Sequence, residues 1–191
     1  AYPEHTEDHS YGLHADSEGE WRYLLTPTPG AANTTRAFEA PISTNVSLDP
    51  PPGFYSGSRD VTMSAEPSDL MEIYYTTNGS EPTTRSTRYT NPVRIARNTV
   101  FRIAGFINGE ERATAVQSAS YFIPGRSFTG ATIDLPVLSI SMPADDFNTV
   151  QTNTGARGRG SEREGYWEYF DEDGELRVST GFGLRLHGGA G

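Results

Sequence analysis

The sequence predicts an all-β protein, an antiparallel β-sandwich with incomplete flanking segments. Three observations support this fold class. The 191 residues include 20 Gly and 13 Pro, and so many turn-forming residues favour short strands over long helices. Short strand-like runs recur between turn signals, and no window of residues 38–123 shows a convincing helical period. The hydrophobic content of 35%, with 11% aromatic residues, is enough for a packed core.

The central segment, residues 38–123, reads as a succession of short strands. Its expected strands lie near residues 45–48, 60–65, 71–77, 92–96, 99–107 and 112–122. The motifs PPPG, NG, NP and a second NG separate them, and each favours a turn. Regular short strands with this punctuation are typical of an immunoglobulin/fibronectin-III-like antiparallel β-sandwich.

The stretch IYYTTNGSEPTTRSTRY, residues 73–89, contains the strongest turn signal. Its alternation gives a strand with two chemically distinct faces. Asn78-Gly79 follows at once, and both residues tolerate the positive φ of a tight turn. Pro82 then removes a backbone donor, and neighbouring hydroxyls can satisfy local backbone groups. We therefore expect a strand, a hydrogen-bonded loop and a return that shape the sheet.

A functional alternative uses the same stretch as a platform for carbohydrate. Tyr74, Tyr75 and Tyr89 would be its ligand-binding residues, with their rings stacked on sugar rings. This hypothesis requires aromatic side chains exposed together on one face. Aromatic residues are enriched in any strand, so turn chemistry explains the stretch better.

The N-terminal segment, residues 1–33, is polar and rich in acidic side chains. Trp21, Tyr23 and Leu25 alternate in the manner of a half-buried strand, and the prolines of LTPTPG stop it. This segment is too short to close a core alone, so we expect it to be the edge of another domain.

The C-terminal segment, residues 134–191, changes character. LPVLSISM predicts a strand that places Leu135, Val137 and Ser139 on one face, and PADDF predicts the start of a helix. Residues 148–165 are Gly-rich and polar, which predicts a flexible loop. YWEYF, the DEDG turn and LRVSTGFGLRLHGG then predict a hairpin. Because the apolar alternation continues up to the last residues, we expect the chain to be a piece of a longer protein.

Composition argues against several classes of function. The formal net charge is −10, and all 15 basic residues are Arg. Such a chain repels polyanions, so we expect no nucleic-acid partner and no binding to anionic lipid. The absence of Cys excludes disulfides and thiolate metal sites. No run of about 18 apolar residues exists, so we expect no membrane span.

Two segments have a metal-binding alternative that we consider weak. His5, His9 and His14 lie among carboxylates, but their spacing matches no standard ligand set, and a solvated segment is expected. The DEDG motif at 171–174 resembles only the first residues of a calcium loop, since the twelfth position from its first Asp is Phe182. A hairpin turn is the simpler interpretation.

The loop GARGRGSER brings Arg157, Arg159 and Arg163 close to glycines. A phosphate-binding loop needs backbone donors aimed by a following helix, and none is expected there. We therefore assign no catalytic residue and no metal ligand to this chain. No set of Ser, His and Asp supports nucleophilic catalysis either.

Residues 73–113, IYYTTNGSEPTTRSTRYTNPVRIARNTVFRIAGFINGEERA, together with the later SASYFI, resemble the β-sandwich at the C-terminus of chitobiase and β-hexosaminidase-type proteins. DPPPGFYSGSRDVTMSA fits the opening of that pattern, and Asn78 replaces the usual Asp. The resemblance covers about residues 41–123 and implies an accessory module without catalytic residues, which matches the predicted domain 38–123.

Both flanks carry a second resemblance. WRYLLTPTPGAAN, within residues 1–33, resembles the C-terminal edge of a lamin-tail domain. Residues 134–191 resemble the opening of a spore-coat-protein-H (CotH) kinase domain in LPVLSISM, EREG and GFGLRLHGG, although Tyr166-Trp167 departs from the family's Pro. The resemblance implies a secreted bacterial cell-surface protein. It implies no cofactor in this chain, and ATP and a divalent metal would belong to the catalytic part of the kinase.

Three functions follow as hypotheses. The first is a non-catalytic extracellular spacer whose partners are neighbouring domains of the same polypeptide. The second is a carbohydrate-binding module that contacts a cell-surface glycan. The third is protein kinase activity, which would reside in the longer protein rather than in this chain.

Overall fold

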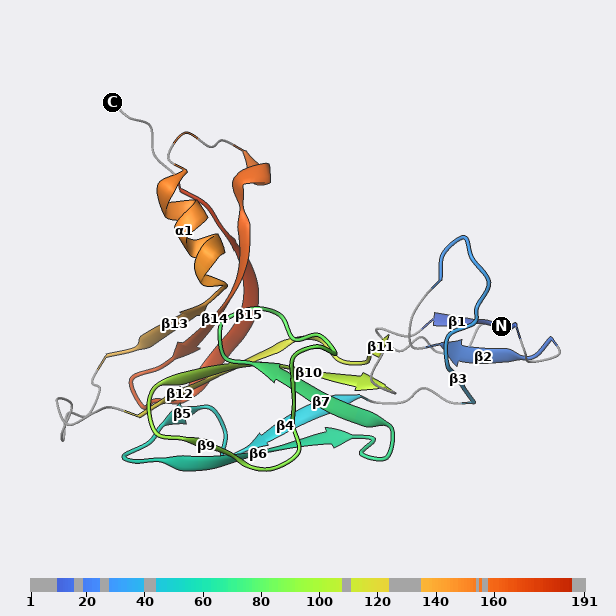
Figure 1. The fold of residues 1–191 in the computed structure, drawn as a ribbon, viewed down its shortest axis with the longest axis horizontal. Coiled ribbons are helices and arrows are strands. Elements are labelled where there is room, and N and C mark those ends of the chain that lie inside the picture. Colours follow the sequence, from blue (N-terminus) through green and yellow to red (C-terminus); the bar gives the residue numbers. More distant parts are fainter. Residues whose placement is uncertain are drawn as a thin grey trace.

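The computed structural model describes residues 10–15, 19–24, 28–39, 44–107, 111–123, 135–153, 155 and 158–186. Four sheets organise these residues (Figure 1), and all strand pairs except one are antiparallel. The predicted all-β fold is confirmed. Among the described residues no helix is both long and apolar enough to cross a membrane.

A small sheet stands at the N-terminal side of the molecule. Its strands, in spatial order, are β1 (Ser10–Leu13), β2 (Trp21–Leu24) and β3 (Ala37–Phe38). The Tyr11 and Trp21 rings stack with centroids 5.5 Å apart, and Leu24 is buried. The strand predicted from Trp21 and Tyr23 is confirmed as β2. Leu25 lies outside the described residues.

Two facing sheets form the central sandwich. The smaller sheet contains β4 (Asn45–Asp49), β6 (Arg59–Glu66) and β9 (Val93–Ile95), in that order. The larger sheet runs β5 (Gly53–Phe54), β12 (Gln117–Phe122), β10 (Thr99–Ile107), β7 (Met71–Thr76) and β8 (Thr87–Arg88), and β11 (Glu111–Arg112) pairs with β10. β5 lies parallel to β12.

Alternation along the strands builds the sandwich core. In β6 the inward side chains are Val61, Met63 and Ala65, and all three are buried. Phe101 and Ile103 of β10 are fully buried opposite them, in the same apolar cluster. Burying side chains of this size contributes about 1.5–3 kcal/mol each, so this cluster supplies the main stabilisation of the sandwich.

The third sheet contains β13 (Val137–Ser141), β14 (Arg163–Phe170) and β15 (Leu176–Leu184), in that order. Helix α1 (Ala144–Thr152) follows β13, and a 3₁₀ turn, η2 (Arg159–Ser161), precedes β14. Figure 1 shows this sheet projecting from the larger sheet of the sandwich, with α1 alongside it. Asp145 and Asp146 occupy the first helical turn, where carboxylates interact favourably with the helix dipole.

The predicted strands of the sandwich agree with the structure within a few residues, with one correction. The strand expected at 112–122 is two strands, β11 and β12, because the four residues from Ala113 to Val116 lie opposite only Ala104 and Gly105 of β10. The Ala113 N–H still donates to the Gly105 carbonyl at 2.8 Å. The loop expected at 148–165 is also shorter than predicted. Helix α1 continues to Thr152, and β14 already begins at Arg163.

Candidate functional site

The three tyrosines proposed for sugar stacking lie on different sides of the larger sheet. Tyr74 is buried on its outer face and packs edge-on against Phe106, with ring centroids 5.3 Å apart. Tyr75 and Tyr89 are partly buried and pack against the core of the sandwich. The Tyr74 hydroxyl donates to Glu72 at 3.0 Å, and this hydrogen bond raises the pKa of Tyr74. Sugar binding by this set stays a prediction.

The outer face of the larger sheet is covered in part by the third sheet, through a buried carboxylate. Glu168 of β14 is only 1% exposed. It accepts hydrogen bonds from the Ser118 hydroxyl at 3.1 Å, the Ser120 backbone N–H at 3.2 Å and the Ser120 hydroxyl at 2.5 Å. Buried carboxylates are retained when their oxygens are hydrogen-bonded. This network ties β14 to β12, two strands that belong to different sheets.

Two serines of β13 complete the network. The Ser139 hydroxyl lies 2.7 Å from that of Ser120, and the Ser141 hydroxyl lies 3.4 Å from that of Ser118. The predicted face of the strand LPVLSISM, residues 135–142, is therefore confirmed for Val137 and Ser139, whose side chains face the sandwich. Leu135 precedes the strand and is 72% exposed.

An aromatic cluster adjoins the carboxylate. Phe170 of β14 is fully buried, and its ring meets Phe54 and Phe122 edge-on at centroid distances of 5.6 and 5.4 Å. Phe54 and Phe122 stack on each other at 4.7 Å. Edge-on and offset-stacked pairs add about 0.5–1.5 kcal/mol to the burial itself. The contact between the larger sheet and the third sheet thus has an apolar part, the three phenylalanines, and a polar part, Glu168 with its serines. We call this whole contact the junction.

Arg102 lies at the other end of the junction. Its guanidinium carbon is 4.1 Å from the centre of the Tyr166 ring, and the residue is 4% exposed. Nη2 is 3.9 Å from Glu81 Oε1, whereas Nε and Nη1 have no hydrogen-bond partner among the described residues. Burial lowers the pKa of Arg102, and Tyr166, Glu81 and Glu168 oppose this shift.

The Asn78-Gly79 turn touches the third sheet directly. Gly79 has φ of +82°, and a Cβ on it would lie 3.0 Å from the Met142 Cα and closer still to the Met142 carbonyl. The Thr76 hydroxyl donates to the Ser80 carbonyl at 2.5 Å, and the Ser80 N–H donates to Asn78 Oδ1 at 3.2 Å. The predicted hydrogen-bonded turn is therefore confirmed, and its tip is a contact point.

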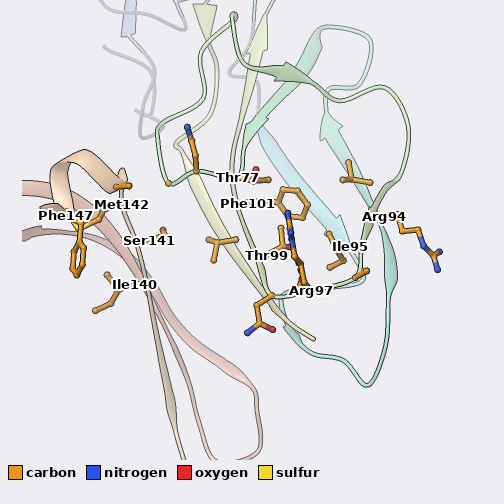
Figure 2. Close-up of a pocket in the computed structure, with 17 residues that line it drawn as sticks. Thr77, Arg94, Ile95, Arg97, Thr99, Phe101, Ile140, Ser141, Met142 and Phe147 are labelled. Carbon is orange, nitrogen blue, oxygen red and sulfur yellow. Dashed lines mark hydrogen bonds between the residues drawn. The ribbon is translucent and has the colours of Figure 1, made fainter. Parts of the chain in front are cut away.

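A cleft opens on each side of this contact. The larger cleft, of about 1060 Å³, has Ile140, Met142 and Phe147 on one wall and residues of the sandwich on the other (Figure 2). Its sandwich wall includes Thr77, Arg94, Ile95, Arg97, Thr99 and Phe101. Apart from Phe101 and Ile95, which belong to the core, these side chains are polar or cationic.

The smaller cleft, of about 620 Å³, lies over Arg102 and Tyr166. Four acidic residues and a second arginine also line it: Glu81, Asp146, Glu162, Glu164 and Arg159. Three glycines also line it: Gly165 lies against the Phe182 ring, Gly181 against the Tyr166 ring and Gly183 against Glu162. This cleft therefore combines one buried cation with several acceptors of hydrogen bonds.

The metal-binding alternatives gain no support from side-chain geometry. Within the described part of the chain, no group of three His or carboxylate side chains is arranged to hold a metal ion. His5 and His9 lie outside that part. In the DEDG turn, Asp171 Oδ1 accepts the N–H groups of Asp173 and Glu175, each at 3.0 Å, and Arg177 pairs with Oδ2. The Arg177 hydrogen bond lowers the pKa of Asp171. The predicted hairpin turn is confirmed.

The two described arginines of GARGRGSER have different surroundings. Arg163 Nε lies 3.6 Å from Asp146 Oδ1, while Arg159 is part of η2 and lines the smaller cleft. Arg157 lies outside the described residues. Helix α1 precedes this loop and β14 follows it, so the loop does not open a helix.

Sequence reasoning missed the residues that make the junction. Arg102 lies within the largely apolar strand TVFRIAGFI, and Glu168 lies between aromatic residues in REGYWEYF. A charged residue between aromatic or branched side chains in a strand is the signal that could have identified them. Charged side chains are rarely buried without partners, so this pattern indicates a sheet face that another part of the protein covers.

Comparison with known protein families gives a match to one part of the chain. No curated protein and no solved structure matches the chain. Residues 50–118 match the family described as "Chitobiase/beta-hexosaminidase C-terminal domain". This range contains β5 to β11 and the first residues of β12, so it includes Arg102, Gly79 and Ser118 but not Glu168. The match supports the resemblance drawn from residues 73–113, and the central segment of this chain is a β-sandwich similar to those accessory modules.

Proposed function

We propose that this chain acts as a non-catalytic spacer and accessory module in an extracellular, CotH-kinase-like surface protein. In this proposal the sandwich holds the segment 134–191 at a fixed orientation. Neighbouring domains of the same polypeptide are its partners. Chemistry, including any use of ATP and a divalent metal, belongs to the rest of that protein.

The observation that carries this proposal is the junction. A spacer that fixes orientation needs a buried contact between the two parts that it joins. Such a contact is most specific when it combines apolar packing with hydrogen bonds. Glu168 meets Ser118 and Ser120 in a buried network, and Phe170 packs on Phe54 and Phe122. Leaving a buried carboxylate without its hydrogen-bond donors costs about 1–3 kcal/mol or more, so the network favours one orientation.

A distance measurement between two spin labels tests the proposal. The chain has no Cys, so Asn91→Cys and Gln151→Cys introduce unique labelling sites at exposed positions on the sandwich and on α1. A fixed orientation gives one narrow distance distribution in solution. Introducing Phe170→Ala and Glu168→Ala together should broaden it. A broad distribution in the otherwise unchanged chain would contradict the spacer role.

The kinase hypothesis has its own control experiment. The purified 191-residue chain and the full-length protein are incubated separately with radiolabelled ATP and a divalent metal. We expect incorporation only with the full-length protein. Phosphoryl transfer by the 191-residue chain alone would show that this chain is catalytic and would replace the proposal.

A further inference from the structure

The strongest unexplained feature is the guanidinium of Arg102 at the base of the smaller cleft. Its side chain is 5% exposed, and the only ion pair it makes among the described residues is the 3.9 Å approach of Nη2 to Glu81. Nε and Nη1 have no hydrogen-bond partner there. A buried charged donor without an acceptor destabilises a fold.

Stacking does not replace those hydrogen bonds. The centre of the Tyr166 ring lies 4.1 Å from the guanidinium carbon and makes a cation–π contact with it. The ring also holds the plane of the guanidinium in one orientation. A planar fork held in this way is suited to a carboxylate, which it recognises through two parallel hydrogen bonds.

The other charges of the cleft restrict what else a ligand can carry. Glu81, Asp146 and Glu162 form ion pairs with Arg112, Arg163 and Arg185 at 3.2, 3.6 and 3.6 Å. Glu164 is exposed and makes no ion pair within the described residues. Glu164 is therefore the lining carboxylate whose negative charge no described arginine neutralises, although Arg159 also lines the cleft. Its oxygens repel a second negative charge on a ligand and accept hydrogen bonds from hydroxyl groups.

The shape of the cleft agrees with a ring-sized ligand. Its volume of about 620 Å³ lies within the range of small-molecule sites. Gly181 has no side chain to cover the Tyr166 ring, and a Cβ there would lie 3.5 Å from the ring, in ordinary van der Waals contact. The Phe182 ring adds an apolar surface to the same wall.

We propose that the smaller cleft binds a polyhydroxylated monocarboxylate, the chemical class of the sugar acids, with its carboxylate on Arg102. The hydroxyl groups donate to the surrounding carboxylates, chiefly to Glu164. This inference goes beyond the spacer role and does not depend on it. It also differs from the platform of Tyr74, Tyr75 and Tyr89, because none of these residues lines the cleft.

The test is isothermal titration of the 191-residue chain with D-glucuronate, D-glucose and inorganic phosphate as probes. We expect saturable binding of glucuronate that is at least about tenfold tighter than binding of either other probe, which corresponds to about 1.4 kcal/mol. Glucose lacks the carboxylate, and phosphate brings extra negative charge without the hydroxyls. Equal affinity for glucuronate and glucose would overturn the proposal.

Arg102→Met, which removes the guanidinium and keeps an unbranched apolar side chain, should abolish the preference for glucuronate over glucose. Arg94→Met is the matched control, because Arg94 is 66% exposed and lies outside the smaller cleft. Glu164→Ala should weaken glucuronate binding by about threefold to tenfold through the lost hydroxyl acceptor. Unchanged binding in Arg102→Met would show that Arg102 is a structural arginine only.

NMR of the unchanged protein provides the test if Arg102→Met does not fold. The side-chain Nε–H resonance of Arg102 in ¹⁵N-labelled protein should shift on saturation with glucuronate and should not shift with glucose. An unmoved resonance at saturation would overturn the proposed contact. A shift with both sugars would overturn carboxylate recognition.

Discussion

Gly79 lies against the backbone of Met142 so closely that a side chain at position 79 has no space. The residue is in the left-handed region, with φ of +82°, and a Cβ would lie 3.0 Å from the Met142 Cα. The Asn-Gly turn therefore has two requirements for glycine. One is the turn conformation itself, and the other is the close approach of Met142, the residue that follows β13.

Gly79→Ala should destabilise the chain by about 1–3 kcal/mol, the sum of a left-handed penalty and a backbone contact that must shift. Gly57→Ala is the matched control, since Gly57 has ordinary φ and open space around its Cβ position. Urea unfolding of both variants measures the difference. Equal free energies of unfolding would show that the turn and Met142 are not in contact in solution.

Phe170→Ala should reduce the free energy of unfolding by about 3–5 kcal/mol, because it empties a fully buried aromatic site. Val178→Ala on the neighbouring strand is the control, since Val178 is 39% exposed and should lose less than about 1 kcal/mol. Calorimetry of the two variants provides the comparison. A small effect at Phe170 would mean that the Phe54 and Phe122 rings are solvated.

Alkaline pH should destabilise the sandwich through Tyr121. This side chain is fully buried, its hydroxyl donates to the Pro50 carbonyl at 2.7 Å, and burial raises its pKa well above that of a free tyrosine. The unfolded chain ionises near pH 10 or so, about the ordinary tyrosine value, before the folded chain does. The corresponding stability is present below that pH and is lost as the pH rises above it.

Urea unfolding measured from about pH 8 to about pH 11 checks this dependence. Tyr121→Phe should be less stable at neutral pH by about 1 kcal/mol for the lost hydrogen bond, and its stability should fall less steeply above about pH 10. Tyr55 and Tyr74 also have raised pKa values, so part of the slope should remain in the variant. Parallel curves for the two proteins would contradict the role of Tyr121.

Strand periodicity and turn chemistry were sufficient to predict the sandwich strands. The β10 range was predicted without error, and β4, β6, β7 and β9 within about two residues, which is better than the usual uncertainty of element ends. The short strands β5 and β8 were not predicted, and β11 was predicted only as the start of the strand at 112–122, because two residues carry no periodicity and are positioned by their partners. β1 and β3 were missed for related reasons, since four or fewer residues with one Gly or one aromatic give a weak pattern.

The site was much harder to predict than the fold. The local sequence suggests ring stacking equally for Tyr74, Tyr75 and Tyr89. The pleat of β7, however, places Tyr74 and Tyr75 on opposite sides of the sheet. Glu168 and Ser120 are separated by 48 residues, and nothing local to either indicates the other. Such a contact depends on how two sheets pack, which a single sequence does not specify by periodicity.

The most direct test of the junction is a double-mutant cycle between Ser120 and Glu168. Ser120→Ala, Glu168→Gln and the double variant are compared with the unchanged chain by urea unfolding. We expect a coupling energy of about 0.5–3 kcal/mol, because the two side chains share a hydrogen bond in a buried site. Strictly additive effects of the two substitutions would mean that the sandwich and the third sheet are not joined through this carboxylate.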